Sequence, residues 1–237
     1  MATLNIWHDA GNWAARLPLI VEALRETEAD VIGLQEILED RDKGLPNQAG
    51  TIAGMLGGYT VHFASSSPPG SPKRYGNAML SRLPVLEEAA KVLEPVNDHR
   101  TALRTRVSLQ DVPIDIAVTH LAWQANAGPV RARQIADMMA WLPQDGAPLV
   151  VLGDFNAALD APELSTLGPP RFGSALGAGT VATTLNPARG HAERVIDHIL
   201  AERCCFETVS ARRFADAAVG DEYPSDHFGV AATLRVL

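Results

Sequence analysis

The chain has 237 residues, of which 46 % are hydrophobic and 20 % are charged, which is ordinary for a folded globular protein. The 28 acidic and 20 basic residues give a formal net charge of −8, which lacks the basic excess typical of proteins that bind long duplex nucleic acid. No apolar run approaches the roughly 20 residues of a membrane-spanning helix. A layered α/β protein of this length commonly forms one unit, so we expect a single domain over residues 1–237.

The cellular compartment is predicted from the N-terminus and the cysteines. No signal-peptide pattern precedes the first predicted strand. The two cysteines, Cys204 and Cys205, are adjacent, so a disulfide between them would be strained and they lack the spacing of metal ligands. We interpret them as reduced thiols and expect a cytoplasmic protein, although a chain whose leader had been removed would look the same.

The first third of the chain alternates predicted strands and helices. In order, these are a strand over 2–7, a helix within 12–29, a strand over 30–38, a helix over 47–58 and a strand over 59–65. The first helix has apolar residues at Leu17, Ile20, Val21 and Leu24, a spacing that places them on one face. Asn12 is its predicted N-cap, and Gly57 is predicted to end the second helix. A loop rich in Pro, Gly and Ser follows over 66–77.

The rest of the chain is predicted to be mostly strands. In order, these are strands within 78–93, a hairpin over 101–121 with its turn near Gln110-Asp111, a helix over 130–143, a strand from Leu149, a loop-rich stretch over 161–189, and strands over 194–202, 204–214 and 223–236. No internal repeat of fixed period is present. Two runs of similar strand content predict two β-sheets packed face to face with helices outside.

Polar side chains recur where the apolar strands end. Any one of them alone is more often a turn former or a structural group. The sequence nevertheless places such groups at six strand ends: Asn5, Glu36, His120, Asp154 with Asn156, Asp197, and Asp226 with His227. If the sheets align these ends, the carboxylates, amides and imidazoles converge in one cleft.

The stretch "LVVLGDFNAAL" is the most informative of these places. A buried ionised carboxylate without a partner is costly, so Asp154 is expected either at the end of its strand or beside a partner. In an extended segment Asp154 and Asn156 project to the same side and Phe155 to the other. The sequence therefore predicts a carboxylate and an amide side by side at the end of a rigid strand.

The residue types suggest phosphoester chemistry. Glu36 and Asn5 offer hard oxygen ligands, which suit Mg²⁺. Asp154 could polarise a water molecule while Asn156 holds a substrate oxygen. There is no zinc-type His or Cys spacing, no Gly-rich phosphate loop and no Gly-x-Ser-x-Gly elbow, so the sequence does not support a zinc protease, a nucleotide-dependent kinase or a serine hydrolase.

Two imidazoles complete this predicted site. Asp197 and His227 form a natural carboxylate–imidazole pair, in which the carboxylate favours an imidazolium that can stabilise charge on a phosphoryl oxygen. His120 would be a second cation or acid with the same purpose.

Several stretches in one order resemble a known family. They are "TLNIW", "DVIGLQE", "YGNAMLSRLPV", "AVTHLAW", "RARQIADMM", "LVVLGDFN", "RVIDHIL" and "SDHFGVAATL". The set is similar to the endonuclease/exonuclease/phosphatase superfamily, the DNase I-like metal phosphoesterases, over almost the whole chain; "GDFN" and the late "SDH" are its specific marks. The resemblance implies a four-layer α/β sandwich of two mixed sheets flanked by helices, and Mg²⁺- or Mn²⁺-dependent cleavage of a phosphoester.

The resemblance also implies roles for individual residues. Glu36 looks like the metal carboxylate with Asn5 near it, and Asp226 like a second-site or outer-sphere metal contact. Asp154 resembles the acid that activates or orients water, and Asn156 its phosphate-positioning neighbour. The remaining matches are Asp197 as the partner that orients His227, His120 as a histidine at the scissile phosphate, and Asn77 as a residue lining the cleft.

One position departs from the family pattern. Many nucleolytic members carry an acid two residues after the first Asn, but here that residue is Trp7. This argues against a second metal ion and leaves Glu36 as the firm metal position. Arg100 is either a phosphate contact or an exposed strand cation, and Trp123 is either a core residue or a platform for a substrate ring at the edge of the cleft.

Other candidate residues have plain interpretations. His8-Asp9 could border the cleft or lie in a loop, and Lys73-Arg74 could meet a phosphate or be solvated. His191 reads as surface loop. His198 follows Asp197 directly and should face the opposite side as a structural residue.

The leading hypothesis is a metal-dependent phosphoesterase that hydrolyses a phosphodiester or phosphomonoester by in-line attack of water. Its substrate could be a small molecule, a lipid headgroup or a nucleic acid. An endo- or exonuclease is the alternative among enzymes, and the negative net charge argues mildly against long duplexes. A noncatalytic module that binds phosphorylated ligands is the alternative from another class.

Overall fold

The computed structural model describes residues 1–237 and contains twelve strands, three α-helices and three short 3₁₀ helices. The strands are β1 (Ala2–Asn5), β2 (Val31–Asp40), β3 (Thr60–Ser65), β4 (Lys73–Ser81), β5 (Val85–Val92), β6 (Thr101–Leu109), β7 (Val112–His120), β8 (Leu149–Asp154), β9 (Phe172–Ser174), β10 (Asp197–Glu202), β11 (Phe206–Phe214) and β12 (Gly229–Val236). The helices are α1 (Trp13–Arg25), α2 (Gln48–Leu56), α3 (Gly128–Trp141), η1 (Val96–Asp98), η2 (Pro162–Leu167) and η3 (Pro187–Arg189).

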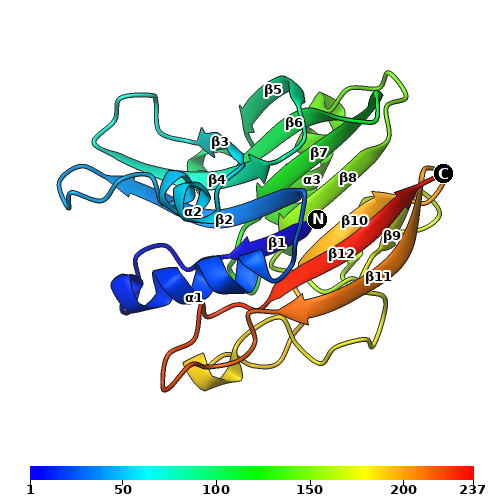
Figure 1. Ribbon diagram of the computed structural model, residues 1–237. Helices are drawn as coiled ribbons and strands as arrows, with labels where there is room; N and C mark the ends of the chain where they lie inside the picture. The colour runs from blue at the N-terminus through cyan, green and yellow to red at the C-terminus, as the bar shows by residue number, and fades with distance from the viewer.

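The strands form two six-stranded sheets that pack face to face (Figure 1). Their orders are β11-β12-β1-β2-β4-β3 and β5-β6-β7-β8-β10-β9. Both sheets are mixed, because β1 pairs in parallel with β2, and β7 in parallel with β8, among otherwise antiparallel pairs. The expected sandwich of two mixed sheets with outer helices is therefore confirmed.

Three apolar clusters hold these layers together. The first packs Ile20 and Leu24 of α1 and residues of α2 against the first sheet, and the second fills the space between the sheets. The third packs Ile135 and Met138 of α3 against the second sheet. Because the apolar faces of α1 and α2 cover the first sheet and that of α3 covers the second, the helical periodicity of the sequence indicates the outer layers.

The helix ends and the hairpin turn follow the sequence signals. The Asn12 side chain accepts a hydrogen bond from the backbone N–H of Ala15, as an N-cap does. Gly57 ends α2 with φ +75°, a conformation that favours glycine. The predicted turn at Gln110-Asp111 joins β6 to β7.

The strand register brings the polar strand ends together. His120 at the end of β7 is paired in register with Asp154 at the end of β8, and Asp197 at the start of β10 is paired with the same Asp154. In the other sheet Asn5 lies opposite Gln35, next to Glu36. The register within each sheet therefore accounts for the meeting of these strand ends, whereas Asn156, Asp226 and His227 lie in the segments that follow β8 and precede β12.

Gly153 allows β7 and β8 to approach closely just before Asp154. Its φ is +141°, and a Cβ atom there would lie 2.0 Å from the carbonyl oxygen of Thr119. We expect Gly153→Ala to lower the free energy of unfolding by at least about 2 kcal/mol, because the backbone must shift to relieve this contact. Gly54→Ala is the matched control in α2, where nothing lies within 4 Å of the added Cβ. It should raise stability by about 0.5–1 kcal/mol. Urea denaturation of both variants checks this, and equal effects would contradict it.

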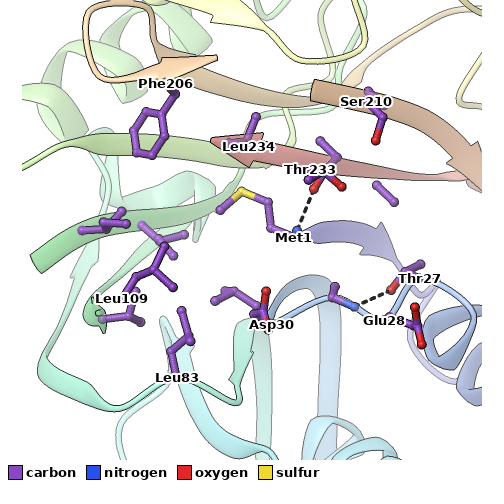
Figure 2. Close-up of a pocket in the computed structure, with 18 of the residues that line it drawn as sticks. Met1, Thr27, Glu28, Asp30, Leu83, Leu109, Phe206, Ser210, Thr233 and Leu234 are labelled. Atoms are coloured by element: carbon purple, nitrogen blue, oxygen red, sulfur yellow. Dashed lines mark hydrogen bonds between the residues drawn. The ribbon is translucent and has the colours of Figure 1, made fainter. Parts of the chain in front are cut away.

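An apolar hollow of about 320 Å³ lies between the sheets at the end away from these polar groups (Figure 2). Leu109, Phe206 and Leu234 line it, and the N-terminal ammonium of Met1 donates a hydrogen bond to the Ala232 carbonyl at its side. The hollow shares no residue with the polar cleft described below. None of the helices is both long and apolar enough to cross a membrane.

Candidate active site

A polar cleft of about 870 Å³ opens where the strand ends meet. Both sheets contribute to it, through Glu36 of β2 and Tyr75 of β4 on one side and His120 of β7 and Asp154 of β8 on the other. Its remaining lining residues are His8, Asp9, Leu38, Lys43, Lys73, Arg100, Trp123, Asn156, Leu185, His191, Arg194, Ile196, Asp226 and His227. The cleft therefore contains most of the residues that the sequence singled out.

Asp154 lies at the centre of the polar contacts. Its Oδ1 accepts the backbone N–H of Asn156 at 2.8 Å, and its Oδ2 accepts the Asn5 amide at 3.1 Å. The same Oδ2 lies 3.3 Å from Nε2 of His120 and 3.8 Å from Nε2 of His227. Burial and the nearby charge of Asp197 raise the pKa of Asp154 to about 7. A carboxyl group with this pKa can accept a proton near neutral pH.

The turn after β8 differs from the extended segment expected. β8 ends at Asp154, and Asn156 has φ +52°, a conformation that Asn tolerates better than most residues. Its side-chain amide donates to the Leu121 carbonyl at 3.1 Å, while Phe155 is fully buried in the apolar core. Both Asp154 and Asn156 still line the cleft because the turn, rather than strand alternation, aims the amide.

Asp197 and His227 form a buried ion pair. Nδ1 of His227 lies 3.0 Å from Oδ2 and 3.2 Å from Oδ1 of Asp197, whose carboxylate is fully buried. Burial alone would lower the pKa of His227, but the carboxylates of Asp197 and Asp154 overcome this effect and raise it to about 10. His227 is therefore an imidazolium at neutral pH.

His120 has the opposite character. Its ring is buried, and burial together with the charges of Arg100 and His227 lowers the pKa of His120 well below its usual value. The ring is neutral at pH 7, so it can donate a hydrogen bond but does not add a second positive charge.

Glu36 faces the cleft because β2 is irregular at that point. The pairing of β2 with β4 shifts register between Leu34 and Ile37, and Glu36 has φ +61°. A β-bulge of this kind turns a side chain away from the regular strand direction. Oε1 of Glu36 accepts the Asn5 amide at 3.2 Å, and the side chain is 17 % exposed. One amide nitrogen therefore joins Glu36 to Asp154 across the two sheets.

The donor groups fit a divalent cation at Glu36. Its carboxylate is a hard oxygen ligand that is exposed to the cleft, and it is linked to Asp154 through the Asn5 amide. A second possible cation site is formed by Asp154, Asp197 and His227, whose ligand atoms all lie within 4.8 Å of one another. In that group both Asp197 oxygens already face the His227 ring, so we interpret it as a proton-holding pair rather than as a cation site.

The remaining predicted residues are placed as follows. Asp226 lines the cleft with its Oδ2 3.1 Å from Nε2 of His191. Arg100 lines it too, with its buried Nε 3.6 Å from Oδ2 of Asp98, and Trp123 is 67 % exposed at its edge. Asn77, expected to line the cleft, is instead buried and donates its amide to the Thr101 carbonyl at 2.8 Å.

Some cleft residues were not anticipated from the sequence. Tyr75 precedes Asn77 by two residues on β4 and lines the cleft in its place, and burial raises the pKa of its hydroxyl. Lys43 and Arg194 come from loops and add positive charge. His191 lies in a loop, as expected, but its Nε2 also faces Oδ2 of Asp226 and the ring lines the cleft. His198, interpreted as structural, is buried and hydrogen-bonded to the Ala157 carbonyl at 2.9 Å.

Arg16 of α1 holds two segments of the site and was also missed. Its fully buried guanidinium donates to the carbonyls of Ile6, Trp7, His8 and Ala10 and, at 3.0 Å, to that of Pro224. The segment 6–10 follows Asn5, and Pro224 precedes Asp226. Nothing in the helical pattern distinguishes this residue, because an Arg on an amphipathic helix is usually solvated.

The family scan matches residues 2–227 to the Endonuclease/Exonuclease/phosphatase family. Among solved structures, the human Nocturnin catalytic domain with bound sulfate anion is 21 % identical and covers 100 % of this chain and 94 % of its own, with a TM-score of 0.79. Humanized zebrafish (D. rerio) TDP2 is 18 % identical and covers 99 % and 97 %, with a TM-score of 0.78. The Bacteroides thetaiotaomicron mannosyl-6-phosphatase Bt3783 is 17 % identical and covers 99 % and 98 %, with a TM-score of 0.77. No curated protein gave a match.

Proposed function

Because the chain belongs to the endonuclease/exonuclease/phosphatase family, we propose that it hydrolyses a phosphoester bond with the help of a divalent cation. The observation that carries the proposal is the unbroken line of contacts from Glu36 through Asn5 and Asp154 to His227, none longer than 3.8 Å. It joins a cation-binding carboxylate, a proton acceptor and an imidazolium within one cleft.

Each residue has a role in the proposed reaction. Glu36 would hold an Mg²⁺ or Mn²⁺ ion, and such an ion supplies Lewis-acid stabilisation of a phosphoryl oxygen when it is bound. Asp154 accepts a proton from the attacking water as the water oxygen bonds to phosphorus and the bond to the leaving oxygen breaks. Asn156 positions the phosphate beside it.

The charge that develops on the phosphoryl group is stabilised by the two imidazoles. His227 donates from Nε2 as an imidazolium, because Asp197 holds its Nδ1. His120 donates as a neutral ring. Arg100 also lines this cleft, and its guanidinium adds a positive charge near the phosphoryl group.

The size and charge of the cleft favour a small phosphoester as the substrate. A volume of about 870 Å³ is typical of sites that enclose a small molecule. A nuclease acting on short strands is the second candidate, because Lys73, Arg100 and Arg194 place basic side chains in the cleft that could contact further phosphates, although the net charge of the chain is −8.

A substrate panel tests the proposal. Hydrolysis of bis(p-nitrophenyl) phosphate, p-nitrophenyl phosphate and plasmid DNA should be measured with Mg²⁺, with Mn²⁺ and with EDTA. We expect turnover of at least one ester that EDTA abolishes. Plasmid nicking well above the rates on the small esters would favour the nuclease, and the absence of metal-dependent turnover on all substrates would favour a noncatalytic module.

Trp123 is expected to bind a ring of the substrate. Its exposed indole stands at the edge of the cleft, three residues after His120, and stacking on such a ring contributes about 1–3 kcal/mol. We expect Trp123→Ala to raise KM for bis(p-nitrophenyl) phosphate about tenfold while kcat changes less than threefold. Leu86→Ala, which removes an exposed apolar side chain from β5 outside the cleft, is the control. An unchanged KM would show that Trp123 does not contact the ring.

A further inference from the structure

The histidine beside Glu36 has the surroundings of a metal ligand. Nε2 of His8 lies 3.9 Å from Oε2 of Glu36, and both side chains line the cleft. Two atoms bound to one ion at roughly 2.1 Å each can lie at most about 4.2 Å apart, so both can reach the same ion. Neither side chain has to cross the cleft to bind the shared ion.

The other ring nitrogen of His8 is held by a carboxylate. Nδ1 lies 2.9 Å from Oδ1 of Asp9, and Asp9 is in turn paired with Lys43. Metal-binding histidines regularly donate one ring N–H to a carboxylate in this way, which leaves the lone pair of the other nitrogen directed at the ion. Here that other nitrogen is the one facing Glu36.

The backbone around His8 is fixed in an uncommon conformation. Trp7 has φ +59° and His8 has φ +33°, values in the left-handed region that residues other than glycine seldom adopt. The His8 carbonyl accepts hydrogen bonds from Arg16 at 2.9 Å and from Gln48 at 3.0 Å. These partly buried contacts maintain the strained turn, and strain of this kind is concentrated at functional sites.

We propose that His8 is a direct ligand of the cation bound at Glu36, with Asp9 as the group that orients it. The proposal rests on the proposed function, because that function places the cation at Glu36. An imidazole ligand favours first-row transition metals, whereas Mg²⁺ retains water in preference to nitrogen. The site therefore selects an ion such as Mn²⁺, Co²⁺ or Zn²⁺ over Mg²⁺. In place of the acid that many family members carry at the position of Trp7, this chain supplies a nitrogen ligand one residue later.

Binding of Mn²⁺ to the whole protein, followed by electron paramagnetic resonance, tests this without relying on activity. We expect pulsed spectra of the bound ion to show ¹⁴N coupling from a coordinated imidazole. His8→Ala should abolish that coupling and weaken Mn²⁺ binding about 10- to 100-fold, while Mg²⁺ affinity, measured by competition, changes less than about threefold. Asp9→Asn should keep the coupling and weaken Mn²⁺ binding about tenfold.

Two control variants separate the possible failures. His62→Ala removes a histidine on β3 that pairs with Glu88 outside the cleft, and it should leave Mn²⁺ binding unchanged. Glu36→Gln should abolish binding of both ions; full binding by this variant would overturn the cation position in the proposed function itself. If Glu36→Gln fails to bind but ¹⁴N coupling persists in His8→Ala, another imidazole holds the ion and the role of His8 is overturned.

Discussion

Replacing Asp154 by asparagine is expected to lower kcat about 10³-fold on whichever ester the enzyme hydrolyses fastest, while KM changes little. The substitution keeps the shape of the side chain and its acceptor for the Asn156 N–H, but it removes the proton acceptor at the centre of the cleft. A loss confined to kcat would identify an interaction made in the transition state. Steady-state kinetics on purified wild type and variant provide the measurement.

Stability separates this loss from misfolding. Asp154 is 1 % exposed, and its Oδ2 accepts the Asn5 amide at 3.1 Å, so the amide nitrogen of an asparagine would face a second N–H donor and destabilise the fold by about 1–3 kcal/mol. We expect the melting temperature of Asp154→Asn to fall by roughly 2–10 °C, while the circular dichroism spectrum at the assay temperature stays that of the folded wild type. Asp160→Asn, at an exposed carboxylate six residues along the chain, is the matched control and should be fully active. A variant that keeps more than a tenth of the wild-type kcat would remove Asp154 from the proposed chemistry.

Replacing His227 by glutamine is expected to lower kcat about 10²- to 10³-fold and to change the pH profile. The proposed reaction requires Asp154 to be ionised and His227 to be protonated. Activity should therefore rise with pH up to about 7 and fall above about 10. A bound divalent cation lowers the pKa of Asp154 and moves the acidic limb to lower pH. Glutamine does not titrate, so the alkaline limb should disappear in His227→Gln.

The same histidine links stability to pH. Its pKa of about 10 in the folded protein lies above the usual value of 6.5, so the ion pair contributes stability that is complete below pH 6.5 and is lost as pH rises through about 10. The difference in melting temperature between wild type and His227→Gln should therefore be larger at pH 6 than at pH 10. His62→Gln is the control for the melting experiment. In the pH profile of activity, an alkaline limb that persists in His227→Gln would show that another group titrates there.

The sandwich and most of the cleft were predictable from the sequence because their signals are local. Apolar runs specify the strands, helical spacing specifies the outer layers, and the polar groups stand at the ends of those runs. Asp154, Asp197 and His120 meet because neighbouring strands end in register, which a one-residue shift would have prevented.

The sequence did not predict residues whose role depends on how far along a strand they lie from the cleft, or on the path of a loop. Tyr75 and Asn77 share one face of β4, and the alternation of a strand does not show which of them reaches the cleft and which lies under Thr101. His191 enters through a loop with no repeating pattern. Arg16 has the sequence environment of a solvated helix residue, and only the folded loop around it supplies its carbonyl partners.

The Arg16 contacts have a consequence for motion in the molecule. The Arg16 side chain bonds to the turn after the first strand and also to the carbonyl of Pro224, which stands 208 positions after Arg16 and precedes the last strand. Transient opening of either turn breaks bonds that also restrain the other, so the two should open as one cooperative unit. The cation position and the imidazolium would then be lost together rather than one at a time, and a partly assembled catalytic centre would rarely be populated.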